Sequence, residues 1–136
     1  MTKNLRIPMS RASPADLDHQ FAAELSIGDL NALLTLYEPN GIQVRQDGTV
    51  TRGRDELRRT MESFAAMRPD LSLEVIDVVP FHDGLAVVLD RWTMRAAGTE
   101  GPHAETDGVG VHIARRQANG DWLFVATGLG NLIPPA

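Results

Sequence analysis

Asp90 and His112 are the side chains whose types and positions suggest chemistry most directly. They lie on two strand-forming stretches, 85–95 and 105–117, joined by a loop at 96–104. If that loop closes symmetrically, paired residue numbers sum to about 200, which places Asp90 diagonal to His112 and within side-chain reach. A carboxylate beside an imidazole is typical of a general base, and equally of an interface ion pair or a structural histidine. We favour the ion pair or the structural histidine.

The same register predicts the neighbours of this pair. Asp90 faces Gly110 and Trp92 faces Gly108, so the two glycines leave room for a carboxylate and a large ring. We therefore expect both side chains to lie close over the neighbouring strand.

Three other polar residues each allow two interpretations. Asp107, diagonal to Arg91 on the second face of these strands, is either a base whose pKa is raised by desolvation or the partner of Arg91. Tyr37 ends an apolar stripe and is either an acid or a core ring with its hydroxyl at the rim. His103 lies in a Gly-Pro loop and is either a proton shuttle or an exposed histidine.

Other signatures of chemistry are absent from the sequence. The four histidines, at 19, 82, 103 and 112, show no i, i+4 or His-x-His spacing, and there is no cysteine. There is no Gly-x-Ser-x-Gly, Walker loop or Gly-x-Gly-x-x-Gly. We therefore expect neither a metal nor a cofactor.

The elements that must position these residues follow from caps and periodicity. Ser13 and Asp29 are typical helix N-caps, and Asp47-Gly48 is typical of a two-residue hairpin turn that needs positive φ at both positions. The sequence predicts helices at about 14–27, 30–37 and 54–67, and strands at 42–46, 49–52, 71–81, 85–95, 105–117 and 122–127. Four sequential strands covered by helices on one face form an α+β domain, expected to span 13–136 after a flexible tail at 1–12.

Strand 85–95 is apolar on both faces, whereas a sheet covered by helices on one side is expected to carry polar residues on its other face. An isologous dimer is the simplest cover for the second face. We expect a homodimer through the face that carries Ala86, Val88, Trp92 and Met94.

Composition excludes several partners. The chain of 136 residues carries 18 acidic and 13 basic residues, a net charge of -5, without a run of Lys or Arg that could follow a phosphate backbone. No stretch is apolar enough for a signal peptide or a membrane span. We expect a cytoplasmic protein that binds neither nucleic acid nor membrane.

The segment GDLNALLTLYEPNGIQVRQDGTVTRGRDELR and the NGDW turn resemble the nuclear transport factor 2-like superfamily, in its polyketide-cyclase-like and ketosteroid-isomerase-like branch. The resemblance covers about residues 13–128. It implies a cystatin-like α+β roll, in which a cone-shaped, curved antiparallel sheet is covered by three N-terminal helices around a ligand pocket.

Ketosteroid isomerase stabilises an oxyanion with a tyrosine and a protonated acid and uses a carboxylate base. Aligning AAELSIGDLNALLTLY with the helix-Gly-Asp-helix segment of the superfamily places Phe21 at the tyrosine, and the resemblance places Arg45 at the base and Val111 at the buried acid. All three roles are lost, so ketosteroid isomerase activity is not expected. At the pocket position Arg45 would instead clamp a carboxylate or an enolate, unless it is a solvated strand arginine.

Two functions remain open. The first is a cofactor-independent acid–base enzyme, an isomerase, cyclase or hydrolase, acting on a small hydrophobic molecule. The second is a non-catalytic dimeric module that uses the same fold for ligand binding or assembly. The candidate catalytic residues are Arg45, Asp107 and Tyr37, and the candidate substrate-binding residues are Phe21, Arg91, Val109, Val111, Phe124 and His103.

Overall fold

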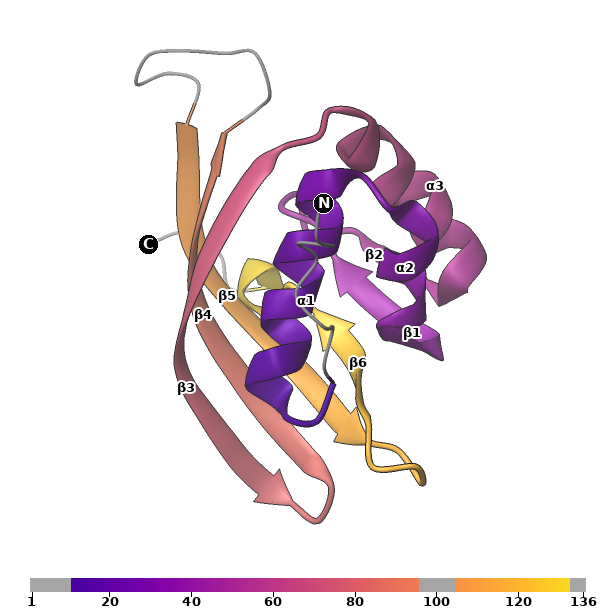
Figure 1. Ribbon diagram of the computed structural model, residues 1–136, viewed down its shortest axis with the longest axis vertical. Coiled ribbons are helices and arrows are strands. Elements are labelled where there is room, and N and C mark those ends of the chain that lie inside the picture. The colour runs from indigo at the N-terminus through magenta and orange to yellow at the C-terminus, as the bar shows by residue number, and fades with distance from the viewer. Residues whose placement is uncertain (1–10, 96–104, 133–136) are drawn as a thin grey trace, which may run out of the picture.

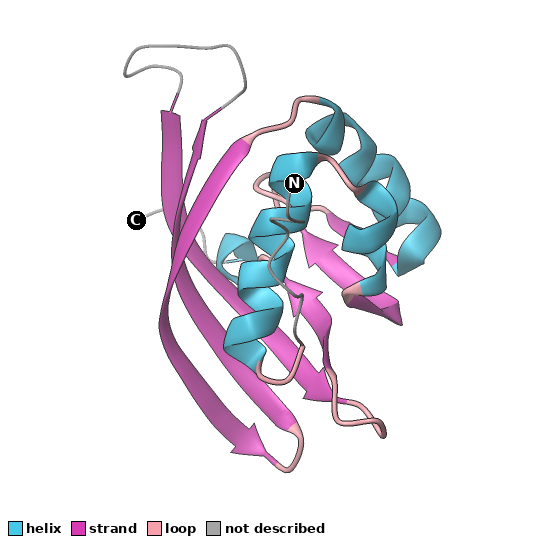
Figure 2. Cartoon of the chain, in the orientation of Figure 1, coloured by secondary structure: helices cyan, strands magenta, loops and turns pink. Residues whose placement is uncertain are grey.

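The computed structural model describes residues 11–95 and 105–132. Within these ranges the chain forms three α-helices, a short C-terminal 3₁₀ helix and a six-stranded sheet (Figures 1 and 2). None of the helices in the described ranges is long and apolar enough to cross a membrane. The elements are α1 (Pro14–Ile27), α2 (Leu30–Thr35), β1 (Tyr37–Val44), β2 (Val50–Arg52), α3 (Gly53–Ala66), β3 (Asp70–His82), β4 (Leu85–Arg95), β5 (Glu105–Arg116), β6 (Trp122–Thr127) and η2 (Leu129–Leu132).

Helix ends follow the caps read from the sequence. The Ser13 hydroxyl accepts the backbone N–H of Asp16 at 3.1 Å, and Gly28 ends α1 in the left-handed region with φ 77°. Asp29 caps α2 in the same way by accepting the N–H of Ala32 at 3.1 Å. These caps fix the angle at which α1 turns into α2.

The sheet order is β2-β1-β6-β5-β4-β3. Strands β3 to β6 form the expected antiparallel meander, and the pairs Asp90↔Gly110 and Trp92↔Gly108 confirm the predicted register of β4 and β5. The fold class is confirmed, with one difference from the expected antiparallel sheet. Strand β1 runs parallel to β6, so the sheet is mixed.

Three local predictions need correction. Tyr37 does not end the second helix; it begins β1, where it pairs with Phe124. The loop at Asp47-Gly48 has three residues and not two, because Arg45 pairs with Thr49. Of these three residues only Gly48 has a positive φ, which is typical of a turn closed by a glycine bulge. The backbone carbonyl of Arg11, a residue expected in a flexible tail, accepts a hydrogen bond from the N–H of Trp122 at 2.8 Å.

The curved sheet wraps around α1, and α2 and α3 lie beside it over the β1–β2 end (Figure 1). The core between the layers is made of side chains from all three helices and the inner sheet face: Leu17, Leu25, Leu33, Leu34, Leu36, Tyr37, Leu57, Met61, Val88, Ala114 and Phe124. Burial of these apolar groups is the main force that holds the layers together.

The sheet face expected at a dimer interface lies inside the single chain. Ala86 and Val88 are fully buried in the core layer, and Trp92 and Met94 line an internal cavity. The helices therefore cover the face that we had assigned to a partner. The outward face carries Leu89, Arg91, Asp107 and Val109 instead, and the expected homodimer itself stays a prediction.

Candidate functional site

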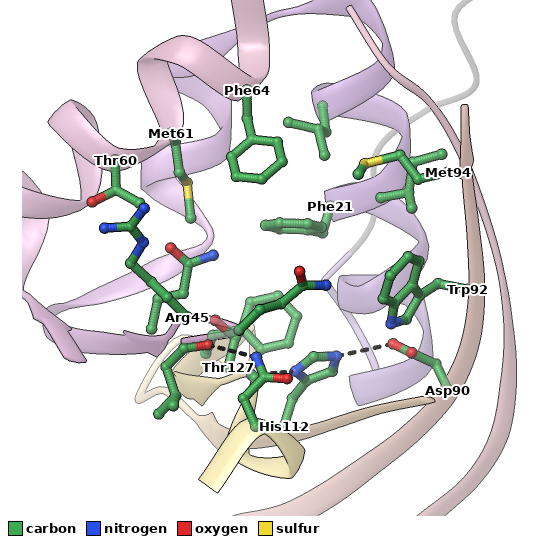
Figure 3. A pocket seen from close by; sticks show the side chains of 18 of the residues that line it. Phe21, Arg45, Thr60, Met61, Phe64, Asp90, Trp92, Met94, His112 and Thr127 are labelled. Atoms are coloured by element: carbon green, nitrogen blue, oxygen red, sulfur yellow. Dashed lines mark hydrogen bonds and ion pairs between the residues drawn. The ribbon is translucent and has the colours of Figure 1, made fainter. Parts of the chain in front are cut away.

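A cavity of about 390 Å³ lies between α1, α3 and the inner face of the sheet (Figure 3). Its size is within the range of small-molecule sites. Most of its wall is apolar, contributed by Phe21, Leu25, Met61, Phe64, Leu71, Leu73, Trp92, Met94 and Phe124. The polar groups of the lining gather in two places, one around Asp90 and the other around Arg45.

The first polar group, which we call the acid cluster, consists of Asp18, Asp90 and His112 from α1, β4 and β5. Asp18 is 2% and Asp90 is 1% exposed. Nε2 of His112 lies 2.9 Å from Oδ2 of Asp90 and 3.9 Å from Oδ1 of Asp18. The predicted pair of Asp90 and His112 is thus confirmed, but it faces the cavity and has a third member.

Gly110 makes this close approach possible. A Cβ atom at position 110 would lie 2.6 Å from Nε2 of His112 and would overlap Oδ1 of Asp90. A Cβ at Gly108 would likewise lie 2.7 Å from Cζ2 of Trp92. The two glycines therefore accommodate the carboxylate and the indole ring, as the sequence predicted.

The tautomer of His112 is set by the chain that follows β6. The backbone N–H of Gly128 donates a hydrogen bond to Nδ1 of His112 at 3.1 Å, so Nδ1 carries no proton. Nε2 then holds the ring proton and donates a hydrogen bond to Asp90. His112 therefore acts here as a hydrogen-bond donor to a carboxylate, with neither ring nitrogen free to accept a proton from a cavity ligand.

The two aspartates differ in protonation. Burial, together with the hydrogen bond to Asp90 and the repulsion of its charge, raises the pKa of Asp18 to about 9. Burial also acts to raise the pKa of Asp90, but the hydrogen bonds from His112 and Asp18 outweigh it and leave that pKa below its usual value. At neutral pH Asp18 is therefore protonated and Asp90 is ionised.

One oxygen of each carboxyl group is buried without a conventional donor nearby, Oδ2 of Asp18 and Oδ1 of Asp90. A buried carboxylate oxygen without a partner is costly. A single proton shared between the two carboxyl groups removes that cost. The pair then behaves like other carboxyl dyads, which share one proton because two neighbouring carboxyl groups cannot both ionise.

The acid cluster is also the one group of potential metal ligands found in the described ranges, with one ligand atom of each residue within 4.8 Å of the others. A metal would need an imidazole lone pair. Nδ1 of His112 already accepts the Gly128 N–H, and Nε2 is directed at Asp90. The donor set therefore fits a proton better than a metal ion.

Arg45 lines the opposite side of the cavity, near Thr60 of α3 (Figure 3). It is exposed, consistent with a position at the cavity mouth. Gln43, two residues earlier, also lines the cavity, and its Oε1 atom is buried without a hydrogen-bond partner. We call Gln43 and Arg45 the polar corner.

The structure divides the residues predicted from the sequence into two groups. Phe21 and Phe124 line the cavity together with Arg45. Tyr37 does not belong to the lining; it is fully buried, and its hydroxyl lies 2.7 Å from Oγ1 of Thr127. Burial raises the pKa of its phenol further above the usual value, which makes it a poor acid.

Four of the other predicted residues do not reach the cavity. Asp107 and Arg91 are exposed on the outer face, and no ion pair joins them within the part of the chain described here. Val109 and Val111 share that face, because β5 directs alternate residues outward. Arg45 and Asp107 therefore lie on opposite faces of the sheet and do not pair. His103 lies outside the described residues.

Sequence reasoning did not identify Asp18, Gln43 or Trp92 as site residues. Asp18 carried a usable signal, since Asp18, Ala22 and Leu25 follow an i, i+4, i+7 spacing along the buried side of α1. An acid on such a stripe is rarely buried without a function or a partner. Trp92 was noticed but assigned to the wrong side of the sheet.

Comparison with known proteins supports the fold and identifies a family. Residues 19–125 match the sequence profile of the family described as SnoaL-like domain. No curated protein matches the chain. The fold itself recurs widely among solved structures, although sequence identities are low.

Three of these structures illustrate the range. A ketosteroid isomerase-like protein from Erwinia carotovora atroseptica superposes with a TM-score of 0.69 at 18% identity, covering 89% of this chain and 95% of that one. A putative calcium/calmodulin-dependent protein kinase type II association domain from Thiobacillus denitrificans gives 0.71 at 15%, covering 89% and 95%. A domain of unknown function with a cystatin-like fold from Nostoc punctiforme gives 0.71 at 13%, covering 90% and 76%. At these identities the likeness concerns the fold alone.

Proposed function

Because this chain belongs to the SnoaL-like domain family and carries a buried acid pair in an apolar cavity, we propose that it is a cofactor-independent acid–base enzyme. Its substrate is a small hydrophobic molecule with a carbonyl group. The observation that carries the proposal is the contrast between Asp18 and Asp90. Two adjacent buried carboxyl groups with opposite pKa shifts form an acid and a base side by side.

The pair supports an enolisation in which protons balance. Asp18 donates its proton to the carbonyl oxygen of the substrate, and Asp90 removes a proton from the adjacent carbon, whose C–H electrons form the C=C bond of the enol. The pair begins and ends with one proton. The shared hydrogen bond returns that proton from Asp90 to Asp18 once the enol is released or reprotonated elsewhere, as in an isomerase or a cyclase.

The surroundings favour this use of the pair. The apolar wall around the acid cluster excludes water, which strengthens each charge–dipole interaction inside the cavity. His112 keeps Asp90 ionised before it takes up the substrate proton, because the Nε2 proton is directed at that carboxylate. We assign His112 the role of a positioning residue.

Deuterium exchange tests the proposal without knowledge of the natural substrate. Hydrophobic aryl ketones, beginning with γ-benzoylbutyrate, are incubated with the protein in D₂O, and loss of the signal from the carbon next to the carbonyl is followed by proton NMR. Removing a general acid or base typically costs about a hundredfold or more. We expect losses of that size for Asp18→Asn and Asp90→Asn.

Asp107→Asn is the matched comparison, since Asp107 was the base expected from the sequence. Exchange that survives in Asp107→Asn but not in Asp90→Asn supports the acid cluster. Exchange at the buffer rate in the wild type, despite binding of the ketones, would instead favour a binding module. Turnover of a steroid enone is not expected in any of these proteins, since Phe21, Arg45 and Val111 replace the groups that ketosteroid isomerase uses.

Assembly is a second candidate, favoured by the outer face of the sheet. Val109 is 58%, Ile76 47% and Val79 41% exposed, and Leu89 and Val111 lie between them as a cross-strand pair. Several exposed apolar side chains on one face, here beside Arg91 and Asp107, are typical of an association site. We propose that a second copy of the chain covers it in a two-fold dimer, in place of the inner face expected from the sequence.

Sedimentation of single variants tests the dimer. Val109→Glu adds a charge to the outer face and should give monomers without disturbing the core, because Val109 is already exposed in the single chain. Ile27→Glu is the control, since Ile27 is 54% exposed at the end of α1, away from this face. A wild-type protein that sediments as a monomer at micromolar concentration would refute the dimer.

A further inference from the structure

The two polar regions lie apart in one cavity, whose remaining wall is mostly apolar. In Figure 3, Asp90 and His112 lie at the lower right, Arg45 lies beside Thr60 on the left, and Phe21 and Phe64 line the space above them. A ligand that satisfies both regions must therefore be polar at two ends and apolar in the middle. The chemistry of each end can be inferred separately.

The polar corner faces the cavity for a structural reason. Gln43 pairs with Thr51 across β1 and β2, and directly paired residues share one face of a sheet. Oγ1 of Thr51 lies 3.2 Å from Oγ1 of Thr60 on α3, so this face is turned toward α3 and the cavity. Arg45 follows Gln43 by two residues and, continuing the alternation, faces the same way.

Both side chains of the polar corner lack a partner for their polar groups. Oε1 of Gln43 is buried with no hydrogen bond. No hydrogen bond or ion pair of the Arg45 guanidinium is found in the described ranges, although its charge is close enough to Asp47 to help lower the pKa of that carboxyl group. An unsatisfied buried amide costs free energy, and a free guanidinium has a geometry that matches a carboxylate.

Arg45 is also the single Arg or Lys among the described residues that line the cavity. A carboxylate placed there would accept two hydrogen bonds from Arg45, and one from Gln43 with its side-chain amide turned to present the NH₂ group. The acid cluster repels a carboxylate, because Asp90 is ionised, but the protonated Asp18 donates to a neutral carbonyl oxygen. The two ends therefore select different groups.

We propose that the cavity binds a hydrophobic keto acid, with its carboxylate between Arg45 and Gln43 and its ketone oxygen against Asp18. This inference rests on the proposed function for the role of Asp18 and adds the substrate class. Phe21, Phe64 and Trp92 surround the apolar body between the two ends. An aryl or alkyl chain of several carbons separates the carboxylate from the ketone.

Calorimetric titration with three matched probes tests the substrate class. γ-Benzoylbutyrate has both polar groups, γ-benzoylbutyramide lacks the charge, and δ-phenylvalerate lacks the ketone. A charge-assisted hydrogen bond contributes about 1.5 kcal/mol or more, which corresponds to about tenfold in Kd. We expect the keto acid to bind about tenfold more tightly than the amide and also more tightly than δ-phenylvalerate.

Variants assign this preference to residues. Arg45→Ala should weaken binding of the keto acid about tenfold and leave binding of the amide unchanged. Gln43→Ala should weaken binding of the keto acid to a smaller extent. Arg59→Ala is the matched control, because Arg59 is an exposed arginine of α3 that does not line the cavity. Equal effects of Arg45→Ala and Arg59→Ala, or no binding of the keto acid by the wild type, would overturn the proposal.

Asp18→Asn separates this inference from the proposed function. Asparagine keeps a hydrogen-bond donor at position 18 but cannot give up a proton, so the keto acid should bind within about threefold of the wild type while deuterium exchange is lost. Binding that requires Arg45 without any exchange supports the ligand class alone. Exchange that is unaffected by Arg45→Ala supports the enzyme and refutes the ligand class.

Discussion

Nε2 of His112 lies 2.9 Å from Oδ2 of Asp90, and this hydrogen bond decides which of two buried aspartates carries the charge. Since the N–H of Gly128 occupies Nδ1, the imidazole presents its proton to Asp90 and not to the cavity. Asp90 is stabilised as a carboxylate, and its charge in turn keeps a proton on Asp18. The protonation states of the two aspartates are thus set by a contact between β4 and β5.

Asp18 should make the protein less stable as pH rises. Its pKa is raised from 3.8 to about 9, so between these values the folded state holds a proton that the unfolded chain has released. The stabilisation from this proton is complete below about pH 3.8 and declines up to about pH 9, by at most about 1.4 kcal/mol per pH unit. Urea unfolding from pH 5 to pH 9 should show this decline in the wild type and a flatter profile in Asp18→Asn.

Parallel pH profiles for the two proteins would show that Asp18 is ionised in the folded state. Asp90 contributes with the opposite sign, because its pKa is lowered. Its stabilisation is present above the unfolded pKa and is lost as pH falls through the folded one. Asp90→Asn should therefore alter the acid side of the profile most clearly.

Gly110→Ala should separate Asp90 from His112. The added methyl group would lie 2.6 Å from Nε2 of His112, so one of these side chains must move. Overpacking of this kind typically costs about 1–3 kcal/mol. We expect a lower Tm and a change in the nitrogen-15 shifts of the His112 ring.

Gly130→Ala provides the control for that experiment. Its Cβ would meet the nearest atom, Cγ2 of Val111, at 3.4 Å, an ordinary contact. It should leave both the Tm and the ring shifts unchanged. If Gly110→Ala also leaves the ring shifts of His112 unchanged, the pair does not depend on the glycine.

Tyr37→Phe should affect stability and not binding. The Tyr37 hydroxyl lies 2.7 Å from Oγ1 of Thr127 in the core, and Tyr37 does not line the cavity. Loss of this hydrogen bond should lower the free energy of unfolding by about 1 kcal/mol. The Kd of a cavity ligand should stay within about twofold, since no atom of the lining is removed. Loss of deuterium exchange in Tyr37→Phe would restore the catalytic role expected from the sequence.

Trp92→Ala should weaken ligand binding and leave association unchanged. The indole lies over Gly108 and forms part of the cavity wall on the inner face. Removing this aromatic surface from contact with a ligand ring should raise the Kd about tenfold. The sedimentation coefficient should match that of the wild type, whereas the interface expected from the sequence requires dissociation. The titration and the sedimentation run can be made on the same preparation.

Local sequence determined the elements and much of the register. Ser13, Gly28 and Asp29 place the helix ends through caps that need only neighbouring residues. The pairing of Gly108 with Trp92 and of Gly110 with Asp90 was predicted correctly, because loop closure and strand alternation fix antiparallel partners. The contact between Asp90 and His112 was predictable for the same reason.

The tertiary structure decided which face of the sheet is internal. Strand β4 is apolar on both faces, so its alternation does not distinguish the core from the outside. Packing of α1 against the Val88 face makes the choice, and it moves Asp90 and Trp92 into the cavity while Asp107 and Val109 remain outside. The parallel pairing of β1 with β6 likewise depends on a long-range contact that no local pattern indicates.

The site chemistry depends on that choice. Asp18 comes from a helix far from Asp90 and His112 in the sequence, and its raised pKa requires both burial and the neighbouring charge. Neither is a property of the residue itself. The sequence alone determined which groups this protein has for chemistry, and the packing of α1 into the curved sheet determined which of them meet, because pKa values and hydrogen bonds depend on distance in space.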